Sequence, residues 1–117
     1  MDKINVDTNE IDKFNRLSSR WWDLNGDFKP LHKINPLRLD FILKNINLNN
    51  CNVADIGCGG GILSESMIDY GARVTGIDMA PDVIRVANIH KKESGKDIEY
   101  KNITVEELAM RSPRSFD

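Results

Sequence analysis

The sequence has few cysteines, no long apolar run and no excess of charge of one sign. Its 117 residues include 2 cysteines, Cys51 and Cys58, and no histidine or further cysteine is arranged around them as metal ligands. A disulfide framework and a zinc site are therefore not expected. No apolar run approaches the roughly 20 residues that a membrane-spanning helix needs. The 16 basic and 18 acidic side chains are interspersed, which excludes the basic patch typical of a nucleic-acid-binding protein.

The first seven residues are polar and partly acidic. Residues 1–7 read Met-Asp-Lys-Ile-Asn-Val-Asp, which resembles neither a secretory signal nor an arginine-rich transit peptide. Hydrophobic residues make up 40% of the chain and charged residues 29%, as is usual for a globular protein. We therefore expect an intracellular, cytoplasmic protein.

The chain divides into an N-terminal helical arm, residues 1–50, and a partial α/β domain, residues 51–117. In the arm, Ile11, Phe14 and Leu17 follow helical spacing. Asn35 and Pro36 form a pair typical of the start of a second helix. Two adjacent tryptophans, Trp21 and Trp22, lie between these helices.

Strands and helices alternate in the second part. Apolar runs predict strands over 53–56, 73–77 and 98–100, and the segments between and after them predict helices over 62–70, from Pro81 to about 93, and after Thr104. Gly71 and Gly95 are placed to end the first two helices, and Thr104-x-x-Glu107 is a capping box for the last. This alternation indicates βαβ crossovers and a parallel sheet, so the fold class is α/β.

A glycine-rich loop follows the first strand. Asp55-x-Gly57-x-Gly59-x-Gly61 stands between a strand and a helix, where glycines allow positive φ angles and close approach of a ligand. The following helix start offers free amides to an anion. The dinucleotide fingerprint needs a third glycine three positions after the second, but residue 62 is Ile62. The spacing favours another adenosine cofactor, and an NAD-dependent oxidoreductase stays as an alternative.

Two charged residues are candidates for the same site. Asp78 ends the second strand about 20 residues later, where a carboxylate can accept hydrogen bonds from both ribose hydroxyls. Its alternative role is that of a helix N-cap or a turn acid before Pro81. Arg38, considered alone, reads as a solvated charge on a helix.

Several other side chains are interpreted as structural. His32 and His90 have no visible partner, and Cys58 reads as a small filler of the glycine loop. Trp21 and Trp22 are more typical of core or lid packing than of a substrate platform. Asn102 and Thr104 follow the third strand, where an adenine edge could be recognised.

The glycine loop, Asp55-Ile56-Gly57-Cys58-Gly59-Gly60-Gly61, resembles motif I of the class I S-adenosylmethionine-dependent methyltransferases. Further stretches narrow the resemblance to the ubiquinone-biosynthesis O-methyltransferases: 20–23 (Arg-Trp-Trp-Asp), 26–32, 34–39, 59–67 and 74–79. That family methylates polyprenyl catechol and hydroxyphenol intermediates. The resemblance covers nearly the whole chain but only the N-terminal half of the family's Rossmann-like fold, since the fourth strand would begin near residues 115–117.

The resemblance implies the cofactor and its contacts. S-adenosylmethionine contacts of the family fall on Arg38, Gly57 and Asp78 of this sequence, and the catalytic residue stays unassigned. The Glu/Glu-His cluster that the family is thought to use for a divalent metal is absent, so no metal ligand is predicted. A polyprenyl phenol substrate, peripheral contact with the inner face of a membrane and a quinone-biosynthesis complex are the implied partners. The alternative is a truncated, non-catalytic fragment that only binds cofactor.

Overall fold

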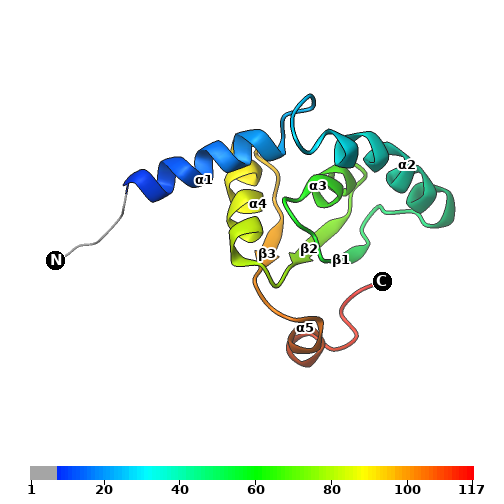
Figure 1. Cartoon of the computed structure of the whole chain (residues 1–117). Helices are drawn as coiled ribbons and strands as arrows, with labels where there is room; N and C mark the ends of the chain where they lie inside the picture. Colours follow the sequence, from blue (N-terminus) through cyan, green and yellow to red (C-terminus); the bar gives the residue numbers. More distant parts are fainter. Residues whose placement is uncertain (1–7) are drawn as a thin grey trace.

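A three-stranded parallel sheet with helices on both sides forms the body of the protein. The computed structural model describes residues 8–117, so the N-terminal segment 1–7 interpreted above lies outside the described residues. The strand order is β1-β2-β3, and Figure 1 shows the path of the chain through the elements. In chain order these are α1 (Thr8–Trp21), α2 (Lys29–Asn45), β1 (Asn52–Ile56), α3 (Ile62–Ile68), β2 (Arg73–Ile77), α4 (Pro81–Ser94), β3 (Glu99–Lys101) and α5 (Val105–Arg111).

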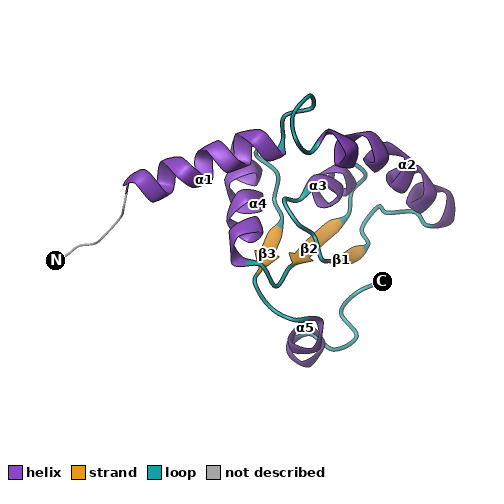
Figure 2. Cartoon of the chain, in the orientation of Figure 1, coloured by secondary structure: helices purple, strands orange, loops and turns teal. Residues whose placement is uncertain are grey.

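The sheet confirms the predicted α/β class. β1 pairs in parallel with β2 from Asn52↔Arg73 to Ile56↔Ile77, and β2 pairs in parallel with β3. Two successive right-handed crossovers in one direction place their helices on the same face, and α3 and α4 do lie together, with α5 on the other side of the sheet (Figure 2). Between the sheet and α3 and α4 lies a hydrophobic core that includes Met67, Val74, Ala87, Ile98 and Tyr100.

Gly95 is the C-cap of α4, as predicted, whereas α3 has Asp69 as its C-cap and Gly71 follows two residues later. Gly71 and Gly95 have φ angles of 87° and 72°, in the left-handed region that glycine adopts without strain. α3 ends at Ile68, two residues earlier than expected. At the start of α5, the Thr104 side chain accepts a hydrogen bond from the Glu107 amide, which confirms the predicted cap.

The start of α2 differs from the prediction. The helix begins at Lys29, with Pro30 in its first turn, and Pro36 lies inside it. A proline is favoured in the first turn because its missing N–H needs no partner there. The sequence offers two prolines six positions apart, and the earlier one marks the helix start. Pro36 is accommodated within a helix of 17 residues, at the loss of one backbone hydrogen bond.

The arm packs against the α/β part through both helices. α1 lies across α4, and α2 lies beside α3 (Figure 1). Phe14 of α1 is buried, and the Arg85 guanidinium of α4 lies 4.7 Å from its ring centroid. No helix within residues 8–117 is both long and apolar enough to cross a bilayer.

The last residue of the chain contacts the first residue of β1. The Asp117 amide donates to the Asn52 carbonyl at 2.8 Å, and the Asn52 amide donates to the Asp117 carboxylate at 2.8 Å.

Candidate functional site

The glycine loop forms a tight turn at the carboxyl end of β1. Gly57, Gly59 and Gly61 have φ angles of 71°, 56° and 92°, a region that disfavours any residue with a side chain. The amides of Gly57 and Cys58 both donate to the Ile77 carbonyl at 2.9 Å, which ties the loop to the end of β2. Ligands of parallel α/β sheets bind at this edge, so the loop occupies the expected place for a site.

Asp78 holds the same loop from β2. Its Oδ2 accepts a hydrogen bond from the Gly59 amide at 3.1 Å, and its Oδ1 accepts one from the Ala80 amide at 2.9 Å. Asp78 follows β2 at its carboxyl end, and its bond to Ala80 is a turn contact before α4, because no side chain caps that helix. A carboxylate has about four acceptor positions, so two further hydrogen bonds to a ligand remain possible.

Asp55 lies beneath the loop as a half-buried carboxyl group. The Ser64 hydroxyl donates to its Oδ2 at 2.6 Å. Burial raises the pKa of Asp55, against the lowering effects of the Ser64 hydrogen bond and the Arg38 charge. Asp55 therefore ties the start of the loop to α3 through the Ser64 hydroxyl.

A cleft of about 140 Å³ lies between the arm and the loop. Arg38 of α2 lines it opposite Asp55, although the guanidinium group is exposed to solvent. Typical small-molecule sites enclose roughly 300–1,000 Å³, so this cleft fits one end of a cofactor. The residues that line it are Trp21, Leu31, Asn35, Arg38, Asp55, Gly57, Cys58, Gly59, Gly60, Ile62 and Leu63.

Arg38 and Gly57 thus share one cleft, whereas Asp78 does not line it and is linked to it through the Gly59 amide. A larger hollow of about 570 Å³ lies at the amino ends of the strands, beside Asn52 and Arg73. Ligand sites in such sheets lie at the opposite, carboxyl edge. We therefore take the smaller cleft as the candidate site.

Cys58 is a buried, unreactive member of the loop. Burial raises the pKa of its thiol to about 12, and the nearby Asp55 and Asp78 charges act in the same direction. The thiol is therefore neutral at physiological pH and cannot act as a nucleophile. This agrees with its interpretation as a small filler.

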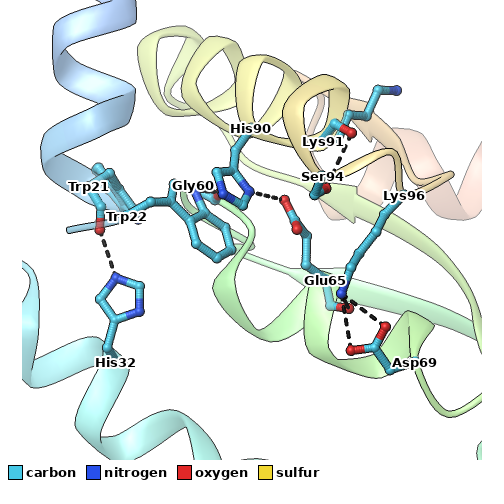
Figure 3. A network of polar contacts seen from close by, with 10 residues as sticks. All are labelled: Trp21, Trp22, His32, Gly60, Glu65, Asp69, His90, Lys91, Ser94 and Lys96. Carbon is cyan, nitrogen blue, oxygen red and sulfur yellow. Dashed lines mark hydrogen bonds and ion pairs between the residues drawn. The ribbon is translucent and has the colours of Figure 1, made fainter. Parts of the chain in front are cut away.

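Two tryptophans of the arm enclose Gly60, a contact that the sequence does not reveal. The Trp22 Nε1 donates to the Gly60 carbonyl at 3.2 Å (Figure 3). A Cβ placed on Gly60 would lie 2.3 Å from the Trp21 Nε1. Trp21 also stacks on Phe28, with ring centroids 4.2 Å apart. We call Trp21, Trp22 and Gly60 the tryptophan clamp.

The Trp21 indole N–H has no hydrogen-bond partner within the described part of the chain, although the atom is buried. The same is true of the Tyr100 hydroxyl, which lies against Gly61. A buried donor without an acceptor is unfavourable. Since Trp21 lines the cleft, its N–H is suited to a ligand that brings an acceptor.

The two histidines do have partners, so the expectation that they lack them is wrong. His90 Nδ1 lies 2.5 Å from the Glu65 carboxylate, and its ring stacks on Trp22 with centroids 3.5 Å apart (Figure 3). His32 Nε2 bonds the Trp21 carbonyl at 2.8 Å. These partners lie 11 to 68 positions away in the chain, so no pattern within one helix could have indicated them.

Asn102 and Thr104 both take part in bonds within the chain. The Asn102 side-chain amide donates to the Asp78 backbone carbonyl at 2.9 Å. Thr104 caps α5 through its hydroxyl. Among residues 8–117 there is also no group of three or more His, Cys, Asp or Glu side chains that could hold a metal ion.

A parallel sheet with a glycine loop after β1 and an acid after β2 defines a Rossmann-like α/β unit. Residues 53–117 match the family model described as "Methyltransferase domain". The chain belongs to this methyltransferase domain family.

Curated relatives extend the similarity to nearly the whole chain. A protein of Chromobacterium violaceum named "Ubiquinone biosynthesis O-methyltransferase" is 54% identical over 113 residues, covering 97% of this chain and 49% of the relative. A protein of the same name from Erwinia tasmaniensis is 56% identical over 117 residues, covering 99% of this chain and 48% of the relative. The chain thus spans about half the length of the curated relatives it matches.

A solved structure supports the fold at lower identity. The magnesium protoporphyrin IX methyltransferase of Synechocystis, crystallised with bound SAH, superimposes with a TM-score of 0.64 at 21% identity. The match covers 79% of this chain and 46% of that chain. The likeness confirms the Rossmann-like fold.

Proposed function

We propose that the chain is the cofactor-binding half of an S-adenosylmethionine-dependent O-methyltransferase that acts on polyprenyl catechols and hydroxyphenols in ubiquinone biosynthesis. The observation that carries the proposal is the glycine loop held by Asp78 beside a cleft that contains Arg38. The relatives named above support the substrate class. We propose residues 1–50 as an arm that covers the site and residues 51–117 as the α/β part that forms it.

The residues present fit this cofactor. Its methionine end carries a carboxylate, which matches the Arg38 guanidinium and the unpartnered Trp21 N–H in the cleft. Its ribose carries two hydroxyl groups, which match the acceptor positions left on Asp78. A Cβ on Gly57 would meet nothing within 4 Å, so the backbone there leaves open space for a ligand.

In the reaction, this chain contributes binding and orientation. When bound, the cofactor would supply a methyl group, activated by a positively charged sulfur, for in-line transfer to a phenol oxygen. Arg38, Gly57 and Asp78 would fix the two ends of the cofactor, and such positioning lowers the entropy cost of the transfer step. The tryptophan clamp excludes water from one side of the loop. We assign no described residue as the base that deprotonates the phenol.

Contact with a membrane surface and with other quinone-biosynthesis proteins is part of the proposal, because a polyprenyl tail partitions into lipid. Trp21 and Trp22 pack on the glycine loop, so they are not the surface for such contact. Ile34, Leu37 and Phe41 of α2 are exposed and lie at spacings that share one helical face. This face is the better candidate for peripheral contact.

A second candidate is a fragment that binds cofactor but does not transfer the methyl group, which the half-length match to the relatives favours. Calorimetric titration with S-adenosylhomocysteine tests cofactor binding, with Asp78→Ala as the variant that should lose it. Methyl transfer from labelled S-adenosylmethionine to a tailless catechol then separates an enzyme from a binding fragment. An absence of measurable binding to the unsubstituted chain would refute both candidates.

A further inference from the structure

A carboxylate is buried behind the glycine loop, outside the cleft. The Glu65 side chain on α3 is only 4% exposed and lies 2.5 Å from the His90 Nδ1 of α4. The nearby Lys96 ammonium bonds the Glu65 backbone carbonyl and the Asp69 carboxylate instead (Figure 3). Burying an ionisable pair costs desolvation free energy. We therefore expect Glu65 and His90 to have a role that two hydrophobic side chains could not perform.

His90 connects this carboxylate to the arm. One edge of its ring bonds Glu65, and one face stacks on the Trp22 indole with an interplanar angle of 3°. The plane of an indole ring determines the direction of its N–H. The Trp22 N–H donates to the Gly60 carbonyl, so Glu65, His90, Trp22 and Gly60 form one continuous series of contacts (Figure 3).

Gly60 is the position where such a series affects the site. The carbonyl of Gly60 and the amide of Gly61 share one rigid peptide plane. The Gly61 amide donates to the Cys58 carbonyl, and the preceding Gly59 amide donates to Asp78. A rotation of the Gly60 carbonyl would therefore disturb the loop on both sides.

We propose that Glu65, His90 and Trp22 are positioning residues that hold the Gly60 peptide in the orientation the cofactor needs. The inference rests on the proposed function. None of the three side chains lines the cleft, so each acts through the loop rather than on the ligand. Because they act in series, loss of one link should have nearly the same effect on affinity as loss of two.

A double-mutant cycle on the full chain tests this inference, with the dissociation constant of S-adenosylhomocysteine as the readout. Trp22→Phe keeps an aromatic ring for the stack but removes the N–H, and His90→Leu removes the stack and the bond to Glu65. We expect each single variant to weaken binding about tenfold and the double variant to be no weaker than about tenfold, as is characteristic of coupled residues. A double variant weakened about a hundredfold would mean independent effects and would overturn the inference.

Conservative and control variants separate positioning from general damage. Glu65→Gln keeps an acceptor oxygen for His90 and should bind within about twofold of the unsubstituted chain, whereas Glu65→Leu should lose about tenfold. Asp69→Asn, at the exposed end of the Lys96 bridge, should change nothing. Equal losses in Glu65→Gln and Glu65→Leu would contradict the series.

Fluorescence gives a readout that does not depend on the ligand. The chain has 2 tryptophans, so in a Trp21→Phe background the emission reports Trp22 alone. Removing the stacked His90 in that background should change this emission, and unchanged emission would overturn the inference. An absence of binding to the unsubstituted chain would overturn the proposed function and the inference together, whereas additive losses overturn the inference alone.

Discussion

The Trp21 indole occupies the space where a side chain on Gly60 would lie, with its Nε1 2.3 Å from the ideal Cβ position. The φ angle of Gly60 is not positive, unlike those of Gly57, Gly59 and Gly61. Gly60 is therefore required by the neighbouring ring rather than by its own backbone conformation. This differs from Gly57, where the backbone angle is positive and the surrounding space is open.

Substitution of Gly60 should accordingly be rescued by a smaller residue at position 21. Gly60→Ala is expected to lower the free energy of unfolding by about 1–3 kcal/mol, because it overpacks a filled site. Urea denaturation of the single and double variants measures this. In a Trp21→Ala background the same substitution should have a much smaller effect, and an undiminished loss would show that the strain lies elsewhere.

Trp21 should discriminate between ligands with and without a carboxylate. Trp21→Phe keeps the ring in the cleft and removes its unpartnered N–H. We expect S-adenosylhomocysteine to bind about tenfold more weakly, which is the value of one charge-assisted hydrogen bond. Methylthioadenosine lacks the carboxylate and should bind unchanged in a parallel calorimetric titration. An equal loss for both ligands would assign Trp21 to packing alone.

Asp78 should show the complementary pattern. Its carboxylate bonds the Gly59 amide and is the proposed acceptor for the ribose hydroxyls. Asp78→Ala should weaken binding of S-adenosylhomocysteine and methylthioadenosine alike, by at least about tenfold. Arg38→Met serves as the matched variant, since it should affect only the ligand with a carboxylate. A selective effect of Asp78→Ala on one of the two ligands would contradict the ribose assignment.

Cys58 should resist alkylation. With the pKa of its thiol raised to about 12, only about one molecule in ten thousand carries a thiolate at pH 8. Iodoacetamide should therefore label the folded chain at Cys51 before Cys58, as read by peptide mass spectrometry, and label both after unfolding. Rapid labelling of Cys58 in the folded chain would contradict its burial.

The same shift predicts a pH dependence of stability. The unfolded thiol ionises near its ordinary pKa of 9.0, whereas the folded thiol stays protonated until about 12. The unfolded state therefore binds fewer protons between these values, and the free energy of unfolding should fall as pH rises through that window. Cys58→Ala should reduce this fall in denaturation curves recorded at several alkaline pH values, and an identical pH dependence in the variant would refute the assignment.

Local sequence signals predict much of the fold. The second strand, 73–77, agrees with β2, Gly95 and Thr104 act as predicted at the helix ends, and Gly71 has the predicted left-handed φ angle. These features depend on a few neighbouring residues, which a sequence displays directly. The predicted start of α2 at Asn35 and Pro36 was wrong, because Pro30 gives the same local signal six positions earlier.

The site was predicted less completely. The glycine loop and the location of Asp78 follow from motif spacing, whereas the tryptophan clamp and the Glu65–His90 pair do not. Trp22 contacts Gly60 across 38 positions, and His90 contacts Glu65 across 25. Such contacts arise from the packing of separate elements against one another. The residue pattern within one helix does not indicate them.

The separation of 38 positions between Trp22 and Gly60 also bears on the order of folding. Helices form rapidly from local contacts, whereas closure of a long loop carries an entropy cost that delays it. α1 leaves the ribosome before any strand of the sheet, and it reaches the glycine loop only when β1 and α3 exist. We therefore expect the clamp to close late, so that ligand-binding competence arrives after the sheet rather than with it.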